Sequence, residues 1–274
     1  MKVKGLTVRT ALITGALASL LLGGPAAAVP GVDEPDTIHV KAVRNPEIRK
    51  YKAILAGLDS FDKHHALAPQ VRELRFHVQP RRGAGRPEAL KVRIEGEHDF
   101  VLPIALDTAN RFTVPRSQTA LDAEGELVLN QKRRFYQVMP EVRTPGLPGN
   151  VRRLGDLRLE CKVMIDIAKE EIPLFWVLTL NSILLTRDWC SFFSEKKHEA
   201  TFSFKTGATL ASAILSEGNR SKALQVEKDE FAIGIGDLDW SDEALVELTF
   251  REPALEAAPS TPTGTAGETP RTAP

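Results

Sequence analysis

Five charged residues around one turn are the strongest candidates for chemistry in this chain. Arg143, Arg152, Arg153 and Arg158 lie close together in sequence with Asp156, beside the glycine- and proline-rich turn TPGLPGN. Guanidinium groups at such a turn could bind a carboxylate, a phosphate or an acidic sugar through paired hydrogen bonds. The alternative is structural, with the arginines flanking the turn and Asp156 capping or pairing locally. We favour the structural interpretation, because no aromatic stacking residue or catalytic base lies near them in sequence.

Motifs of known enzyme classes are absent from the sequence. It contains no G-x-S-x-G, H-E-x-x-H, P-loop or dinucleotide-binding pattern. The two carboxylates that a glycosidase needs cannot be recognised from sequence order among 36 acidic residues. Catalytic residues are therefore unknown, and no cofactor is predicted.

Two groups of residues are of the types that bind metal ions, but their spacing does not match that of a metal site. Asp237 and Asp239 begin like a calcium loop, but the fixed glycine and the distal glutamate of that loop are missing. His64 and His65 are neighbours, and adjacent side chains of a helix point about 100° apart. We therefore predict no metal site, a solvated turn anchored by Trp240, and histidines at a helix end.

The two cysteines, Cys161 and Cys190, are predicted to form a disulfide. Both lie among apolar residues, in a chain that we expect to reach an oxidising compartment. In the loop-entropy model such a bond stabilises by about 3 to 4 kcal/mol. The alternative is two buried free thiols, whereas a redox-active pair is disfavoured because C-x-x-C spacing is absent.

The stretch that follows the arginine turn is predicted to be a long strand at the centre of the fold. From Leu157 to Ile167 every second residue is apolar, and Arg158 and Glu160 belong to the polar set. A period of two over this length is typical of a strand with one buried face.

The other segments support a fold of antiparallel strands. Period-two patterns occur near residues 74–78, 90–94, 100–106, 200–204 and 246–250, separated by turn-rich segments. The run IPLFWVLTLNSILL, residues 172–185, is a buried strand pair or a buried helix, and its β-branched residues favour strands. Asn45 and Pro46 predict the start of an amphipathic helix. We therefore expect a mainly β protein, an antiparallel β-sandwich of one or two packed units with one N-terminal helix.

Both ends of the chain differ in composition from the middle. Residues 1–28 have the basic start, apolar run and small-residue exit of a signal peptide. Residues 29–44 are predicted to be an extended segment, residues 45–251 a β-rich domain with a possible division near 140–149, and residues 252–274 a disordered Pro/Thr/Ala-rich tail. We expect a periplasmic or secreted protein that retains no membrane span once the leader is removed.

The charge of the mature chain argues against nucleic acid as a partner. The leader holds three of the 36 basic residues and none of the 36 acidic ones, so the remainder carries 33 minus 36, or −3. Such a balance does not attract a polyanion. The expected partner is an unknown protein or a component of the cell envelope.

Two resemblances to known proteins accompany these patterns. RTPGLPGNVRRLGDLRLECKV, with AGLDSFDKHHALAP, resembles a family of uncharacterised exported bacterial proteins with no assigned activity. LPIALDTANRFTVP resembles a strand and turn of prealbumin-like or carboxypeptidase-regulatory-like sandwich modules. The first resemblance implies a periplasmic location, and the second implies a β-sandwich fold.

The sequence leads to the hypothesis of an exported, non-enzymatic binding or envelope-associated protein. The alternative is a secreted hydrolase that acts on carbohydrate or peptide polymers through dispersed carboxylates. A hydrolase requires a deep cleft with converging acids, whereas a binding module needs only an exposed face.

Overall fold

The computed structural model describes residues 43–81, 83–85 and 89–251. The predicted signal peptide (1–28), almost all of the predicted extended segment (29–44) and the predicted tail (252–274) lie outside these residues.

Four antiparallel sheets form within the described residues, which confirms the prediction of antiparallel strands. The helices are more numerous than the single one predicted. In chain order the elements are β1 (Pro46–Lys50), α1 (Tyr51–Lys63), the 3₁₀ turn η1 (His65–Leu67), β2 (Arg75–Pro80), β3 (Val92–Glu95), β4 (Val101–Ile104), β5 (Arg111–Phe112), α2 (Gln118–Asp122), β6 (Glu126–Lys132), β7 (Tyr136–Glu141), β8 (Val151–Arg153), α3 (Leu154–Glu171), α4 (Leu174–Leu184), α5 (Trp189–Phe192), α6 (Glu195–His198), β9 (Phe202–Lys205), β10 (Leu210–Glu217), β11 (Arg220–Ala223), β12 (Gln225–Glu227), β13 (Glu230–Ile233) and β14 (Leu245–Phe250).

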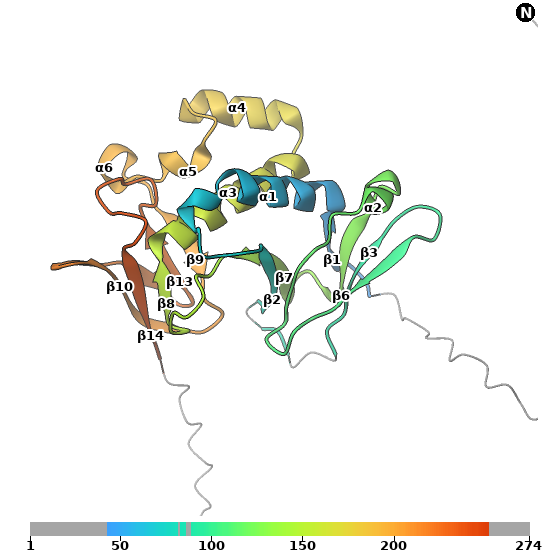
Figure 1. Ribbon diagram of the computed structural model, residues 1–274, viewed down its shortest axis with the longest axis horizontal. Helices are drawn as coiled ribbons and strands as arrows, with labels where there is room; N and C mark the ends of the chain where they lie inside the picture. The colour runs from blue at the N-terminus through green and yellow to red at the C-terminus, as the bar shows by residue number, and fades with distance from the viewer. Residues whose placement is uncertain (1–42, 82, 86–88, 252–274) are drawn as a thin grey trace, which may run out of the picture. The chain divides into compact units, whose positions relative to one another are not determined.

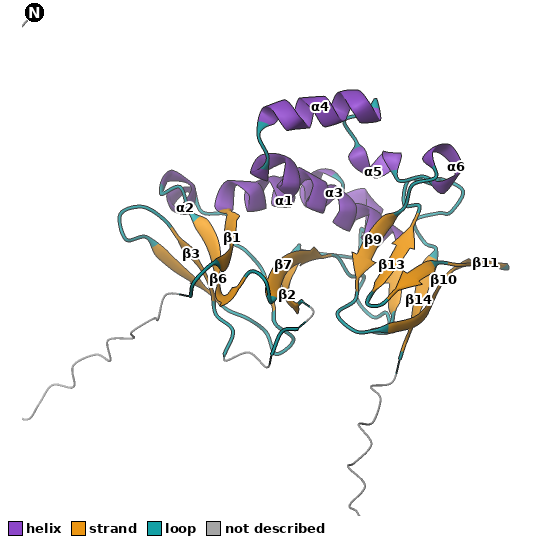
Figure 2. Cartoon of the chain, turned by 180° about the vertical axis from the view of Figure 1, so that it is seen from behind, coloured by secondary structure: helices purple, strands orange, loops and turns teal. Residues whose placement is uncertain are grey.

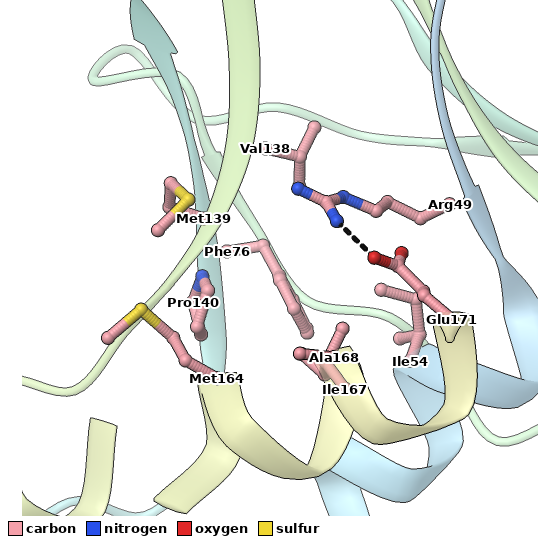
Figure 3. Close-up of a pocket in the computed structure, with 10 residues that line it drawn as sticks. All are labelled: Arg49, Ile54, Phe76, Val138, Met139, Pro140, Met164, Ile167, Ala168 and Glu171. Atoms are coloured by element: carbon pink, nitrogen blue, oxygen red, sulfur yellow. Dashed lines mark hydrogen bonds and ion pairs between the residues drawn. The ribbon is translucent and has the colours of Figure 1, made fainter. Parts of the chain in front are cut away.

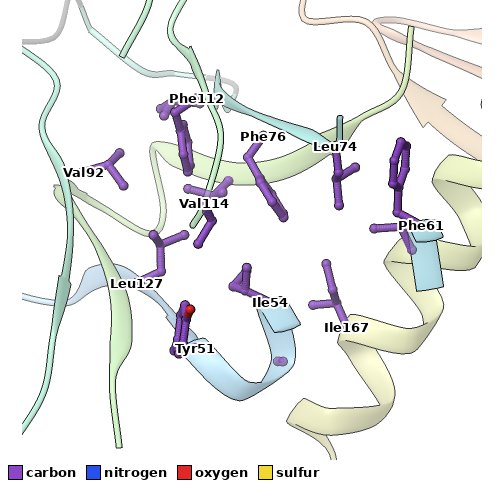
Figure 4. Close-up of a cluster of buried hydrophobic side chains, with 14 of the residues drawn as sticks. Tyr51, Ile54, Phe61, Leu74, Phe76, Val92, Phe112, Val114, Leu127 and Ile167 are labelled. Atoms are coloured by element: carbon purple, nitrogen blue, oxygen red, sulfur yellow. The ribbon is translucent and has the colours of Figure 1, made fainter. Parts of the chain in front are cut away.

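The first hydrophobic core, which we call core 1, lies among α1, α3 and two sheets. The strand orders are β1-β6-β3-β4 and β5-β2-β7. Tyr51 and Ile54 of α1 and Phe76 of β2 lie in this core, where each side chain is almost fully removed from water (Figure 4). Gly57 permits the close approach of the two helices, since an added Cβ there would lie 2.7 Å from Ile167 Cγ1.

The second core, core 2, belongs to the strands that follow α3. The sheets have the orders β11-β10-β14-β8 and β12-β13-β9. Phe204, Leu215, Phe231 and Val246 are buried there together with the first half of α3.

Residues 157–167 are helical, so the predicted central strand is wrong. Helix α3 contributes two stripes of side chains to two different cores. The stripe facing core 2 consists of Leu154, Leu157 and Cys161, and the stripe facing core 1 consists of Leu159, Val163 and Ile167. Each stripe has the three- or four-residue spacing of a helix. Interleaved along the sequence, the two stripes put an apolar residue at every second position and so imitate the alternation of a strand.

The N-terminal helix begins later than its sequence signals predict. Pro46–Lys50 pairs with β6 as strand β1, and Asn45 adopts a left-handed conformation with φ of 54° instead of capping a helix. Sheet hydrogen bonding therefore overrides the local helix signals, and α1 begins at Tyr51. Residues 172–185, for which we favoured strands, form helix α4 and its C-terminal cap.

Candidate functional site

The predicted arginine set is brought together around the start of α3. Asp156, in the first turn of α3, accepts hydrogen bonds from the backbone N–H and the hydroxyl of Thr144, at 2.7 and 2.8 Å. Arg143 donates to Glu141 at 3.3 Å. Burial, followed by the charge of Arg152, lowers the pKa of the Arg143 guanidinium. Asp156 thus holds the arginine turn against α3.

Arg152 lies in a buried ion pair. Its Nη2 donates to Glu160 at 2.8 Å and to the carbonyl of Val142 at 3.1 Å, and the N–H of Val142 donates to the same carboxylate at 3.0 Å. Burial raises the pKa of the Glu160 carboxyl, and the charge of Arg152 and the Val142 N–H oppose that rise. The Nε of Arg152 is buried without a hydrogen-bond partner. Side chains this deep do not reach a ligand in solution.

Arg153 and Arg158 connect α3 and β8 to the loop that precedes β14. Arg153 Nε donates to Glu243 at 2.9 Å. Arg158 pairs with Asp242 at 2.5 Å, and it also donates to backbone carbonyls, among them that of Ile235 at 2.9 Å. These contacts fix the position of α3 against core 2. The role of the set in binding a ligand stays a prediction.

A disulfide joins Cys161 of α3 to Cys190 of α5, which confirms the predicted pairing. The two Cα atoms lie 6.1 Å apart, and both residues are buried. The bond closes a loop that contains α4. We call residues 172–199, which carry α4, α5 and α6 between α3 and β9, the helical insert.

Helix α4 exposes apolar side chains on its outer surface, a feature that the sequence did not lead us to predict. It lies on the side of α3 that faces away from the sheets (Figures 1 and 2). None of its residues is buried. Its five most exposed large apolar side chains are 54 to 70 % accessible, and they are Leu174, Phe175, Trp176, Leu178 and Ile183. Leu185, the left-handed residue that ends the helix, is 90 % exposed.

The inner side of α4 is also apolar, because Val177, Leu180 and Leu184 are half-buried there. The 11 residues of α4 also include no charged residue. A surface helix of a globular protein normally keeps one polar face.

The polar side chains of α4 are bonded within the protein. The hydroxyl of Thr179 donates to the carbonyl of Phe175 at 2.9 Å, and that of Ser182 donates to the carbonyl of Leu178 at 3.0 Å. The Asn181 side-chain oxygen accepts from the Trp189 indole N–H at 2.8 Å. A helix whose hydroxyls bond to its own backbone suits an environment that lacks water.

A groove of about 420 Å³ lies beside the C-terminal end of α4, and we call it the α4 groove. Helix α4 contributes Leu184, and Leu185 follows it; Phe192 belongs to α5, and Leu238 to the loop before β14. The charged residues at the groove are Arg158, Lys162, Asp188 and Lys197, together with the titratable His198.

A second pocket, of about 200 Å³, lies between α3 and strands β2 and β7 (Figure 3). Phe76, Met139 and Met164 form part of its wall, and Arg49 is bonded to Glu171 at 2.6 Å at its side. This volume is below the range of about 300 to 1,000 Å³ that small-molecule sites usually have. We interpret it as a gap in packing beside core 1.

A hollow near Trp240 holds three acids, Glu195, Asp237 and Asp239, together with three basic residues. Asp237 accepts hydrogen bonds from the Ser194 hydroxyl and, at 3.2 Å, from the backbone N–H of Glu195. Asp239 pairs with a lysine, as does Glu195. The three carboxylates are thus engaged separately, and they do not form the converging acid pair that a glycosidase requires.

The residues weighed as metal ligands do not gather into a larger cluster. Within the described part of the chain, no cluster of three or more His, Cys, Asp or Glu side chains could hold a metal ion. His65 Nε2 is bonded to the carbonyl of Val71 at 2.6 Å. Burial, followed by the charges of Lys162 and Lys63, lowers the pKa of His64.

Comparison with known proteins gives no family for this chain. No family model, no curated protein and no solved structure matches it.

Proposed function

We propose that this protein is an exported, non-enzymatic binding protein of the cell envelope that attaches to the surface of a phospholipid bilayer through α4. The observation that carries the proposal is the apolar, charge-free surface of α4. Fully burying one large apolar side chain contributes about 1.5 to 3 kcal/mol. Six side chains that are more than half exposed therefore offer roughly 6 to 12 kcal/mol, before the losses that accompany binding.

The length and chemistry of α4 favour the interfacial zone of a bilayer. Its 11 residues rise about 16 Å, which is about half of a hydrocarbon core. In the described residues no helix is long and apolar enough to cross a membrane. The exposed apolar side chains of α4 include three consecutive residues, Leu174, Phe175 and Trp176, so they spread over a wider arc than the single stripe of a helix that docks in a protein groove. Lipid would surround the outer side of the helix while the inner side packs on the protein.

Two lysines at the base of α4 are paired with neighbouring acids. Lys162 pairs with Asp188, and Lys169 pairs with Asp166 at 3.1 Å. We therefore attribute the attraction mainly to the apolar side chains of α4, so binding to zwitterionic lipid is expected to change little with salt.

Export is part of the proposal, and the disulfide supports it. A bond between two buried cysteines persists in oxidising compartments and is rare in the cytosol. The periplasm or the extracellular space is the location that we propose. No specific observation favours the hydrolase alternative, and the acids of the hollow near Trp240 are engaged separately.

The finer architecture that we propose is two sandwich-like units that share α3. Core 1 takes side chains from both of its sheets, such as Ile94 and Phe76, and core 2 does likewise with Phe204 and Val246. The division between the units would fall at residues 140–149, as the sequence predicts, with α3 serving both cores.

Vesicle flotation tests the function. We expect the mature protein to float with phosphatidylcholine and phosphatidylethanolamine vesicles in both low and high salt. The Leu174→Ser/Leu178→Ser variant should bind about tenfold more weakly or worse. The matched control is Val101→Ser, which changes an apolar side chain that is 55 % exposed on β4. Absence of flotation by the unaltered protein would contradict the proposal, as would equal flotation by the α4 variant and the control.

A further inference from the structure

The α4 groove has the size and the walls of a site for a small apolar ligand. Its volume of about 420 Å³ lies within the range of about 300 to 1,000 Å³ that ligand sites occupy. Leu184, Leu185, Phe192 and Leu238 line it from three separate segments of the chain. Leu185 and Leu238 are 90 and 84 % exposed, so both remain available for contact with a ligand.

The charges around the groove have an excess of cations. Arg158, Lys162 and Lys197 line it, with Asp188 as the one acid among its lining residues in the described chain. Arg158 is bonded to Asp242, and Lys162 pairs with Asp188. These two pairs account for two of the three cations that line the groove within the described residues, and one cation remains.

That cation is Lys197, which forms no ion pair with any acid among residues 43–251 whose positions are described. It belongs to the last turn of α6, next to His198. The His198 ring stacks on Phe192, with the ring centroids 4.6 Å apart. Lys197 and this stacked aromatic pair thus line the same groove.

We propose that the α4 groove binds a free medium-chain fatty acid, with its acyl chain against the leucines and its carboxylate on Lys197. The apolar walls match the alkyl chain, which makes no hydrogen bonds. The unpaired cation matches the single negative charge at the end of the chain. The groove shares Leu185 with the exposed apolar surface at α4, but its occupation requires no bilayer.

Calorimetric titration of the mature protein with laurate tests the proposal. Laurate is kept below its micellar concentration, and vesicles are omitted. We expect saturable binding of one laurate per chain. Lys197→Gln should weaken the affinity about tenfold, because it removes a charge-assisted hydrogen bond. Lys196→Gln is the matched control, since Lys196 pairs with Asp239 in the neighbouring hollow and should retain the affinity of the unaltered protein.

The results separate this site from the attachment of α4 to bilayers. Dodecanol, which lacks the carboxylate, should bind equally to the unaltered protein and to Lys197→Gln. Lack of saturable laurate binding would overturn the inference, and so would equal laurate affinities of the Lys197 and Lys196 variants. Either result leaves vesicle flotation unaffected, whereas a protein that binds laurate without floating would refute only the bilayer proposal.

Discussion

Replacing Cys161 and Cys190 with alanine would remove the covalent link between α3 and α5. The helical insert would then lack its covalent tether to α3. The bond joins residues 29 apart. In the loop-entropy model, closing a loop of this size stabilises the folded state by about 3.6 kcal/mol. For a chain of this length, such a loss lowers Tm by about 7 to 14 °C.

The assay is urea unfolding of three samples: the oxidised protein, the same protein reduced during unfolding and refolding, and the double alanine variant. The reduced protein is the matched control, because it loses the bond and keeps both sulfur atoms. We expect the reduced protein to lose most of the 3.6 kcal/mol estimated from loop closure, and the alanine variant to lose slightly more, since Cys161 is fully buried. Hydrogen exchange should also show faster opening of α4 in both samples.

Equal urea midpoints for the oxidised and reduced protein would refute the reasoning that the bond constrains the unfolded chain. Unchanged exchange in α4 would refute the further reasoning that the disulfide holds the helical insert in place.

Three further predictions concern buried groups of the scaffold. Burial outweighs the opposing charges of Arg49 and Arg133 and raises the pKa of the Glu47 carboxyl above its ordinary value of 4.5. The stability that this carboxyl contributes is therefore complete below pH 4.5 and is lost as pH rises through the folded-state pKa. Glu47→Gln should therefore unfold at a higher urea concentration than the unaltered protein at pH 7, with the difference disappearing below pH 4.5; a lower midpoint at pH 7 would contradict this. Arg152→Met should cost about 3 to 5 kcal/mol in urea unfolding because it leaves Glu160 buried without its counter-charge, and the double change Arg152→Met/Glu160→Leu should restore most of that loss. Gly155→Ala should lower Tm, since a Cβ there would collide with the carbonyl oxygen of Leu67, and an unchanged Tm would show that this contact relaxes freely.

Local alternation in the sequence predicted several of the strands, and the expected oxidising compartment predicted the disulfide. Alternation at residues 74–78 and 246–250 corresponds to β2 and β14, and the pairing of Cys161 with Cys190 is confirmed. The arginine set does gather around one turn, where the structure ties it to α3 and the neighbouring loops.

The strand predicted for residues 157–167 is wrong because this segment contacts two hydrophobic cores. Helix α3 packs on two cores, so it lacks the single apolar stripe that identifies most helices. Its buried charges, Arg158 and Glu160, looked exposed because their partners come from distant parts of the chain or across a turn.

At residues 172–185 the helix was one of the two predicted alternatives, but the preference for strands and the expected burial were wrong. An apolar run of this length is expected to be buried, and the structure leaves much of it accessible. The spacing of Thr179 from Phe175, and of Ser182 from Leu178, was the available signal, because hydroxyls four residues after a carbonyl can bond to it within a helix.

The most direct test of the central claim is the depth of Trp176 in a bilayer. The measurement uses the Trp189→Phe/Trp240→Phe protein, in which Trp176 is the only tryptophan, with phosphatidylcholine vesicles brominated at a shallow position of the acyl chain. The account predicts a blue shift of the Trp176 emission and strong quenching by the brominated lipid, both persisting in high salt. Emission that stays unshifted and unquenched, and that remains open to aqueous iodide with vesicles in excess, would contradict the claim that α4 enters the membrane interface.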